Sequence, residues 1–129
     1  MKCLVVDDSA TMRRIVVNAL KSIGFAETAE AGNGAEALQA CDPTVGLVIT
    51  DWNMPVMGGL DLVKQLRGKP ETAATPILMV TTRSVREDIL QAVQAGISSY
   101  IVKPFTPQVL KEKIDQMLAG APPPVPPAA

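Results

Sequence analysis

Short apolar segments alternate with amphipathic segments along the chain, and this alternation restricts its fold more than any other feature. The apolar segments lie at residues 3–6, 25–31, 45–50, 76–80 and 99–102. Each is followed by apolar residues at helical spacing, and Ser84 with Glu87 predicts a capping box at the start of the fourth helix. Strands that are apolar on both faces indicate a parallel sheet with helices on both faces. Because Glu27 and Glu30 interrupt the second strand, we place it at an edge, which favours the doubly wound α/β order 2-1-3-4-5.

The composition limits the classes of function. The 129 residues carry a net charge of −1, so no global field attracts nucleic acid or an anionic membrane. Histidine is absent, which excludes imidazole-dependent catalytic triads and most zinc sites. No apolar run is long enough to span a membrane, and the two cysteines form no ligand pair, so we predict a cytoplasmic protein with free thiols. Residues 1–119 should form one domain, and the proline-rich residues 120–129 an extended or disordered tail.

Polar residues end four of the five predicted strands. The first strand ends at Asp7 and Asp8, the third at Asp51, the fourth at Thr81 and the fifth at Lys103. The carboxyl ends of parallel strands meet at one rim, where three carboxylates repel one another unless a cation is present. Oxygen donors without histidine or thiolate favour Mg²⁺, and a lysine and a hydroxyl suit a phosphoryl oxygen. Acids also end strands simply because loops are polar, so the hypothesis of a magnesium site with a nucleophilic acid depends on the whole set.

Several segments resemble the receiver domain of two-component response regulators, and most of all the CheY-like single-domain chemotaxis regulators. The matching segments are Val5–Asp8, Thr11–Ile15, Asp51–Pro55, Leu78–Thr81 and Ala95–Phe105. The resemblance extends over residues 3–118 and implies a flavodoxin-like (βα)5 fold. It also implies phosphoryl transfer from a CheA-like histidine kinase to Asp51. Mg²⁺ would be held by Asp8, Asp51 and the main-chain carbonyl of Asn53. Asp7 would assist through water, and Lys103 would contact the phosphoryl group.

The same resemblance implies a switch that joins this site to a distant surface. Thr81 would move toward the phosphoryl group, and Tyr100 would swing into the space that Thr81 leaves. The movement would change the face formed by the fourth helix, fifth strand and fifth helix, where Arg86, Ile89 and Lys113 lie. In chemotaxis the implied partner of this face is the flagellar motor switch protein. We expect a monomer, with a phosphatase as a further candidate partner.

Some positions depart from the pattern of the family. Gly58 stands where an acid or amide is common, which together with Gly59 predicts a flexible loop. Ser9 stands where chemotaxis regulators often have a bulky residue, and Arg83 where the enteric-type regulator has an acid. The resemblance implies that Arg83 and Asn53 flank the path of the hydrolytic water, so the sequence leaves the rate of dephosphorylation open.

Other functions fit parts of this pattern. A Mg²⁺-dependent phosphohydrolase of the haloacid dehalogenase type would need a second acid two residues after its nucleophile, where this chain has Asn53. We therefore expect no enzyme, but only the chain's own phosphorylation and aspartyl-phosphate hydrolysis. A phosphate sink or phosphorelay intermediate would accept the phosphoryl group without binding a motor. A receiver fragment of a larger regulator would use residues 121–129 as its linker. The sequence leaves these last two alternatives open.

Overall fold

The computed structural model describes residues 1–125 and contains five parallel strands in the order β2-β1-β3-β4-β5. The strands are β1 (Lys2–Val6), β2 (Glu27–Ala31), β3 (Val45–Asp51), β4 (Ile77–Thr81) and β5 (Ser99–Val102). The helices are α1 (Ala10–Ser22), α2 (Gly34–Ala40), α3 (Gly59–Arg67), α4 (Arg86–Ala95) and α5 (Pro107–Leu118). The predicted alternation of strands and helices and the predicted strand order are confirmed.

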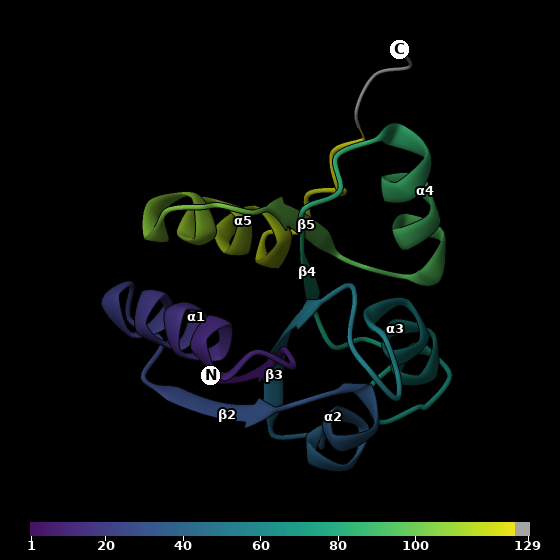
Figure 1. Ribbon diagram of the computed structural model, residues 1–129, viewed down its shortest axis with the longest axis horizontal. Coiled ribbons are helices and arrows are strands. Elements are labelled where there is room, and N and C mark those ends of the chain that lie inside the picture. Colours follow the sequence, from purple (N-terminus) through teal and green to yellow (C-terminus); the bar gives the residue numbers. More distant parts are fainter. Residues whose placement is uncertain (126–129) are drawn as a thin grey trace.

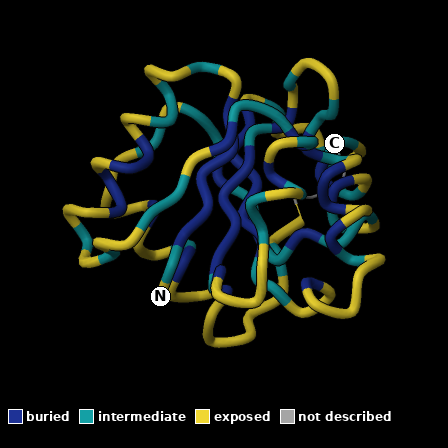
Figure 2. The backbone as a smooth tube through the Cα atoms, turned by 90° about the horizontal axis from the view of Figure 1, so that it is seen from below, coloured by how far each residue is buried: buried dark blue, intermediate teal, exposed yellow. Residues whose placement is uncertain are grey.

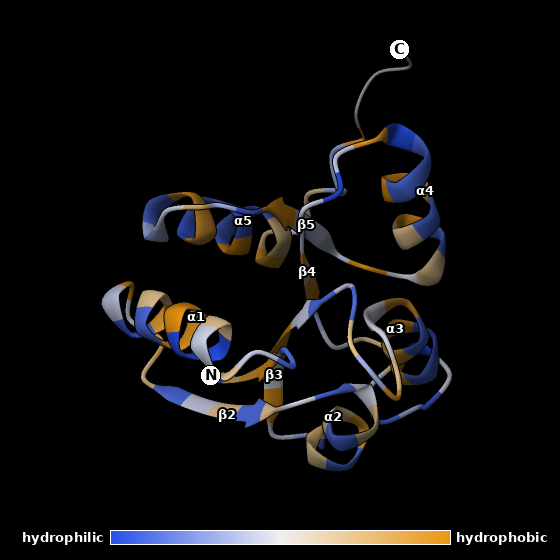
Figure 3. Ribbon diagram, viewed as in Figure 1, coloured by the Kyte–Doolittle hydropathy of each residue, from blue (hydrophilic) through white to orange (hydrophobic). Residues whose placement is uncertain are grey.

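Helices cover both faces of the sheet, as Figure 1 shows. The pair α1 and α5 lies on one face, and α2, α3 and α4 lie on the other. Successive strand residues serve the two layers in turn: Ile49 packs with the α1 and α5 layer, and Val48 with the opposite layer. The strands form the buried centre (Figure 2), and the helices carry polar residues on their outer sides (Figure 3). Both faces are therefore closed, and the carboxyl ends of the strands form an open rim.

The first turn of α4 differs from its predicted form. Val85 is the N-cap, and no side chain caps this end of the helix, so the predicted Ser84 capping box is wrong. Ile89, which the resemblance placed on the partner face, is 0% exposed. It lies three residues before the buried Ala92, so both belong to the stripe that faces inward. The partner face proposed below therefore leaves out the Ile89 side chain.

The predicted tail begins just after the last helix. Helix α5 ends at Leu118, and residues 121–125 form neither helix nor strand. The remaining part of the predicted disordered tail, residues 126–129, lies outside the described residues. Within residues 1–125, no helix has the length and apolar character needed to cross a membrane.

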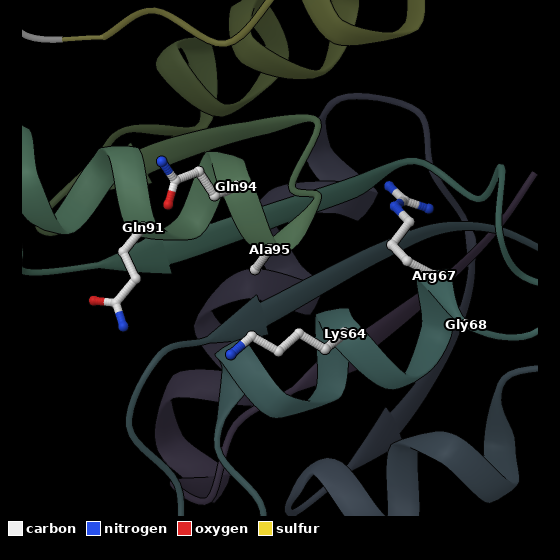
Figure 4. A pocket seen from close by; sticks show the side chains of 6 residues that line it. All are labelled: Lys64, Arg67, Gly68, Gln91, Gln94 and Ala95. Atoms are coloured by element: carbon white, nitrogen blue, oxygen red, sulfur yellow. The ribbon is translucent and has the colours of Figure 1, made fainter.

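Arg67 ties together the loops that lead into β4 and β5. Its Nε donates to the Gly96 carbonyl at 2.9 Å, and its Nη1 donates to the carbonyls of Ala73 at 3.0 Å and Thr75 at 2.7 Å. Figure 4 shows Arg67 beside a groove of about 410 Å³ between α3 and α4. No carboxylate of the described chain pairs with it. Carbonyl groups thus surround the charge of Arg67, and its hydrogen bonds to them fix the amino ends of β4 and β5.

Replacing Arg67 with methionine should lower the free energy of unfolding by about 2–3 kcal/mol, because partly buried carbonyls lose a charged donor. Urea denaturation followed by circular dichroism measures the change. Arg14→Met serves as the control, since Arg14 is exposed and should cost less than about 0.5 kcal/mol. Equal losses in the two variants would contradict the structural role of Arg67.

Candidate functional site

Strands β1 and β3 bring three carboxylates together at the rim. Asp7 and Asp8 directly follow β1, and Asp51 is the last residue of β3, which pairs with β1. One carboxylate oxygen from each acid lies within 4.8 Å of the others. Asp7 is 5% exposed, whereas Asp8 is exposed, so the cluster opens to solvent on the side of Asp8. The sequence-based prediction that these three acids meet is confirmed.

Lys103 supplies a positive charge to this cluster. Its Nζ lies 3.1 Å from Asp51 Oδ1 and 3.8 Å from Asp7 Oδ2. Its main-chain N–H donates to the Thr81 carbonyl at 2.8 Å, which continues the pairing of β4 with β5 and brings the residue to the rim. One lysine faces three carboxylates, so the cluster retains negative charge and suits a further cation.

Asp7 is the most buried of the three acids. The Ser9 amide donates to Asp7 Oδ1 at 2.9 Å, and Arg13 Nη1 donates to the Asp7 carbonyl at 2.5 Å. Burial raises the pKa of the Asp7 carboxyl, and repulsion by Asp51 adds to this, while the Ser9 amide and Lys103 act in the opposite direction. Ionised Asp7 is therefore costly to keep in the folded protein without an added cation.

Replacing Asp7 with asparagine should stabilise the metal-free protein at pH 7, because the amide removes one charge from the cluster. The pKa of Asp7 is higher in the folded protein than its unfolded value of about 3.9. Protonated Asp7 therefore contributes its full stability at pH values below its pKa in the unfolded protein. This contribution is lost as the pH rises through the pKa of Asp7 in the folded protein. The advantage of the variant should shrink as the pH falls from 7 toward 4. Urea unfolding in EDTA measures the difference in free energy of unfolding between the variant and the wild type. A difference that does not change with pH would contradict this account.

Thr81 and Tyr100 lie on the neighbouring strands β4 and β5. Thr81 is 2% exposed, and its Oγ1 accepts a hydrogen bond from the Arg83 amide at 2.8 Å. Tyr100 is half-buried beneath Lys113, whose Nζ lies 5.3 Å from the centre of the ring. Burial raises the pKa of the Tyr100 hydroxyl. The structure thus brings Thr81 to the acidic site and Tyr100 to the surface between α4 and α5.

Tyr100 belongs to a shallow groove on that surface. Together with Phe105, Val109 and Lys113 it lines a space of about 390 Å³. Arg86, the first residue of α4, is partly exposed. Of the four residues expected on the partner face, three therefore retain surface exposure.

The loop after β3 contains a close contact that sequence reasoning missed. Gly59 was expected in a flexible loop with Gly58, but it is buried and begins α3. Its N–H donates to the Trp52 carbonyl at 2.8 Å. A Cβ at Gly59 would lie only 2.2 Å from the Asp51 carbonyl oxygen. The pair of glycines was a visible signal, and at Gly59 it marks a close approach of main chains at the start of α3.

The resemblance placed Arg83 and Asn53 beside one water path, and the structure adds contacts of Arg83 with Trp52 and Asp88. Its guanidinium carbon lies 4.8 Å from the centre of the Trp52 ring. Its Nη1 lies 3.6 Å from Asp88 Oδ2, and its Nη2 donates weakly to Asn53 Oδ1 at 3.4 Å. Asn53 is exposed and follows the acidic cluster by two residues. No local pattern connects these residues, because Arg83 is 30 positions from Asn53.

Comparisons with known proteins agree with this fold. The response regulator receiver domain matches residues 3–115, and the chain belongs to this family. Its relatives include chemotaxis proteins. It is 50% identical over 120 residues to CheY1 of Helicobacter pylori, with 92% of this chain and 97% of that protein covered. It is 48% identical over 118 residues to CheY of Pseudomonas aeruginosa, with coverages of 91% and 95%.

Solved structures show the same likeness. Vibrio cholerae CheY4 matches with a TM-score of 0.81 and 36% identity, over 90% of this chain and 97% of that one. The receiver domain of a histidine kinase from Syntrophus aciditrophicus matches with a TM-score of 0.81 and 29% identity, over 92% and 90%. The chain is thus a CheY-like receiver, a class of signalling proteins that generally are not enzymes, and the predicted flavodoxin-like fold is confirmed.

Proposed function

We propose that this chain is a phosphorylation switch in which Asp51 accepts a phosphoryl group from a CheA-like histidine kinase. The observation that carries the proposal is the position of the Asp51 carboxylate, 3.1 Å from Lys103 and beside two further carboxylates. Its side chain is 13% exposed, so it is accessible but partly shielded from water. A carboxylate in such a place can act as a nucleophile toward phosphorus.

The donors at the rim fit Mg²⁺, because they are all oxygens and their charge is only partly balanced. Asp8, Asp51 and the main-chain carbonyl of Asn53 would hold the ion, with Asp7 assisting through water. The bound ion would neutralise negative charge on the phosphoryl oxygens. Removal of Mg²⁺ with EDTA should therefore prevent phosphorylation.

The chain's own residues have separate roles in the transfer. An Asp51 oxygen forms a bond to phosphorus as the phosphorus–nitrogen bond of the phosphohistidine breaks, and the electron pair stays on the leaving imidazole. Lys103 would turn from the carboxylates toward a phosphoryl oxygen and stabilise its charge. Thr81 would release the Arg83 amide and donate its hydroxyl to a second phosphoryl oxygen. Tyr100 would then move into the space that Thr81 leaves.

This movement would change the face formed by α4, β5 and α5, where Arg86, Tyr100 and Lys113 lie. The chemotaxis relatives support a target at the flagellar motor switch. A phosphate sink or phosphorelay intermediate would use the same acidic site without this output. A monomeric state, a cytoplasmic location and a phosphatase partner remain predictions.

Beryllofluoride, a mimic of the phosphoryl group, should raise the affinity for a peptide from a flagellar motor switch protein about tenfold in the presence of Mg²⁺. Fluorescence anisotropy of the labelled peptide measures this change. Asp51→Asn should abolish the increase, whereas Asp61→Asn, at an exposed acid on α3, should retain it. An unchanged affinity across motor-switch peptides would favour the phosphate sink.

A further inference from the structure

Arg83 bridges three segments around the acidic site. Its guanidinium stacks on Trp52 and touches Asn53, both in the loop after β3, and it pairs with Asp88 in the first turn of α4. Its main-chain N–H holds the Thr81 hydroxyl at 2.8 Å. One residue therefore contacts the loop beside the phosphoacceptor, the hydroxyl expected to move, and the helix at the output face.

The stacked position of Arg83 is kept at the expense of one hydrogen bond. Its Nε is buried and has no hydrogen-bond partner among residues 1–125. Trp52 is only 7% exposed, so its ring is a fixed platform for the guanidinium. Val85 gives the start of α4 no side-chain cap, and the pair with Asp88 links this first turn to Arg83. The bridge thus holds the amino end of α4 near the loop after β3.

We propose that Arg83 is a positioning residue that latches the resting conformation of the switch. The inference rests on the function proposed above. Movement of Thr81 toward a phosphoryl group breaks its bond to the Arg83 amide. The contacts with Trp52 and Asp88 hold that amide in place and so oppose the movement. They favour the resting state and lower the apparent affinity for a phosphoryl group.

The positive charge of Arg83 has the opposite effect to the latch, because it raises the affinity for a phosphoryl group. A cation beside the site attracts an incoming anion, so loss of the charge alone would weaken the binding of a phosphoryl mimic. Loss of the latch would strengthen it. The direction of the change therefore distinguishes the latch from simple attraction of the anion.

The test is a beryllofluoride titration of the full chain in the presence of Mg²⁺. Binding is monitored through the fluorescence of Trp52, the only tryptophan. Arg83→Ala should lower the half-saturating concentration about three- to tenfold. This factor corresponds to the typical energies of one cation–π contact and one exposed ion pair. Arg83→Lys keeps the charge but loses the planar stack, and should give a smaller decrease. Arg14→Ala makes the same charge change at an exposed position elsewhere, and should leave the midpoint unchanged.

A second measurement separates a latch from a purely structural role. By linkage, Arg83→Ala should raise the affinity for the motor-switch peptide without beryllofluoride by a similar factor, because more of the chain already occupies the active state. An unchanged or higher half-saturating concentration in Arg83→Ala would overturn the latch. A wild-type chain whose fluorescence does not respond to beryllofluoride would instead overturn the proposed function.

Discussion

Replacing Asp51 with asparagine is expected to abolish labelling of the chain by acetyl phosphate in the presence of Mg²⁺. The amide keeps the size of the side chain but removes the nucleophilic oxygen that Lys103 and the neighbouring acids surround. We expect the labelling rate to fall roughly 100-fold or more, to the background of the assay. Incorporation of radioactive phosphate, together with the added mass of the intact protein, measures the loss.

The control for this experiment is Asp61→Asn. Asp61 is an exposed acid in the first turn of α3, outside the acidic cluster, so its labelling should equal that of the wild type. The labelling rate of Asp8→Asn should lie between those of Asp51→Asn and Asp61→Asn, because this variant loses a proposed metal ligand and keeps the nucleophile. Undiminished labelling of Asp51→Asn would reject Asp51 as the phosphoacceptor.

Replacing Gly59 with alanine is expected to destabilise the protein by about 3 kcal/mol or more. The new Cβ would lie 2.2 Å from the Asp51 carbonyl oxygen and 3.1 Å from Trp52 Cα, and main-chain atoms cannot yield as a flexible side chain can. In an open helix the same substitution would stabilise by about 1 kcal/mol, so a loss identifies the contact as its cause. Urea unfolding measures the change in free energy.

Gly58→Ala is the matched control, one residue earlier. Its Cβ would meet only the Trp52 carbonyl at 3.2 Å, and the backbone φ of −80° suits any residue. We expect Gly58→Ala to lower the free energy of unfolding by less than about 1 kcal/mol. Gly59→Ala should also slow labelling by acetyl phosphate, because its clash pushes on the residue that carries the nucleophile. Similar stabilities for the two variants would contradict the role assigned to Gly59.

The parts of the fold that follow from periodicity could be predicted. Strands that are apolar on both faces must be covered by helices, and this condition determined the layers. Glu27 and Glu30 placed β2 at an edge, where the structure has it. The acidic cluster followed for the same reason, since Asp7, Asp8 and Asp51 end neighbouring strands. Lys103 followed as well, because its strand ends at the same rim.

Features that depend on contacts between distant residues could not be predicted. The bond from Arg67 to the Gly96 carbonyl crosses 29 positions without a local pattern. Only the resemblance brought Arg83 near Asn53, which is 30 positions away. The Ser84 motif predicted a cap, but the helix begins at Arg86 after an N-cap at Val85. For Ile89, the resemblance indicated the partner surface. Its side chain is buried, in line with that of Ala92.

The pairing of β4 with β5 has a consequence for how the protein is made. Every residue of β4 is buried, and β5 covers one of its edges. A ribosome releases β4 before β5, so the nascent chain passes through a stage in which an apolar strand has an unpaired edge. Such an edge can pair with another chain and aggregate. Shortened versions of the protein that end before Ser99 would keep this edge permanently, and should be produced mainly as insoluble material.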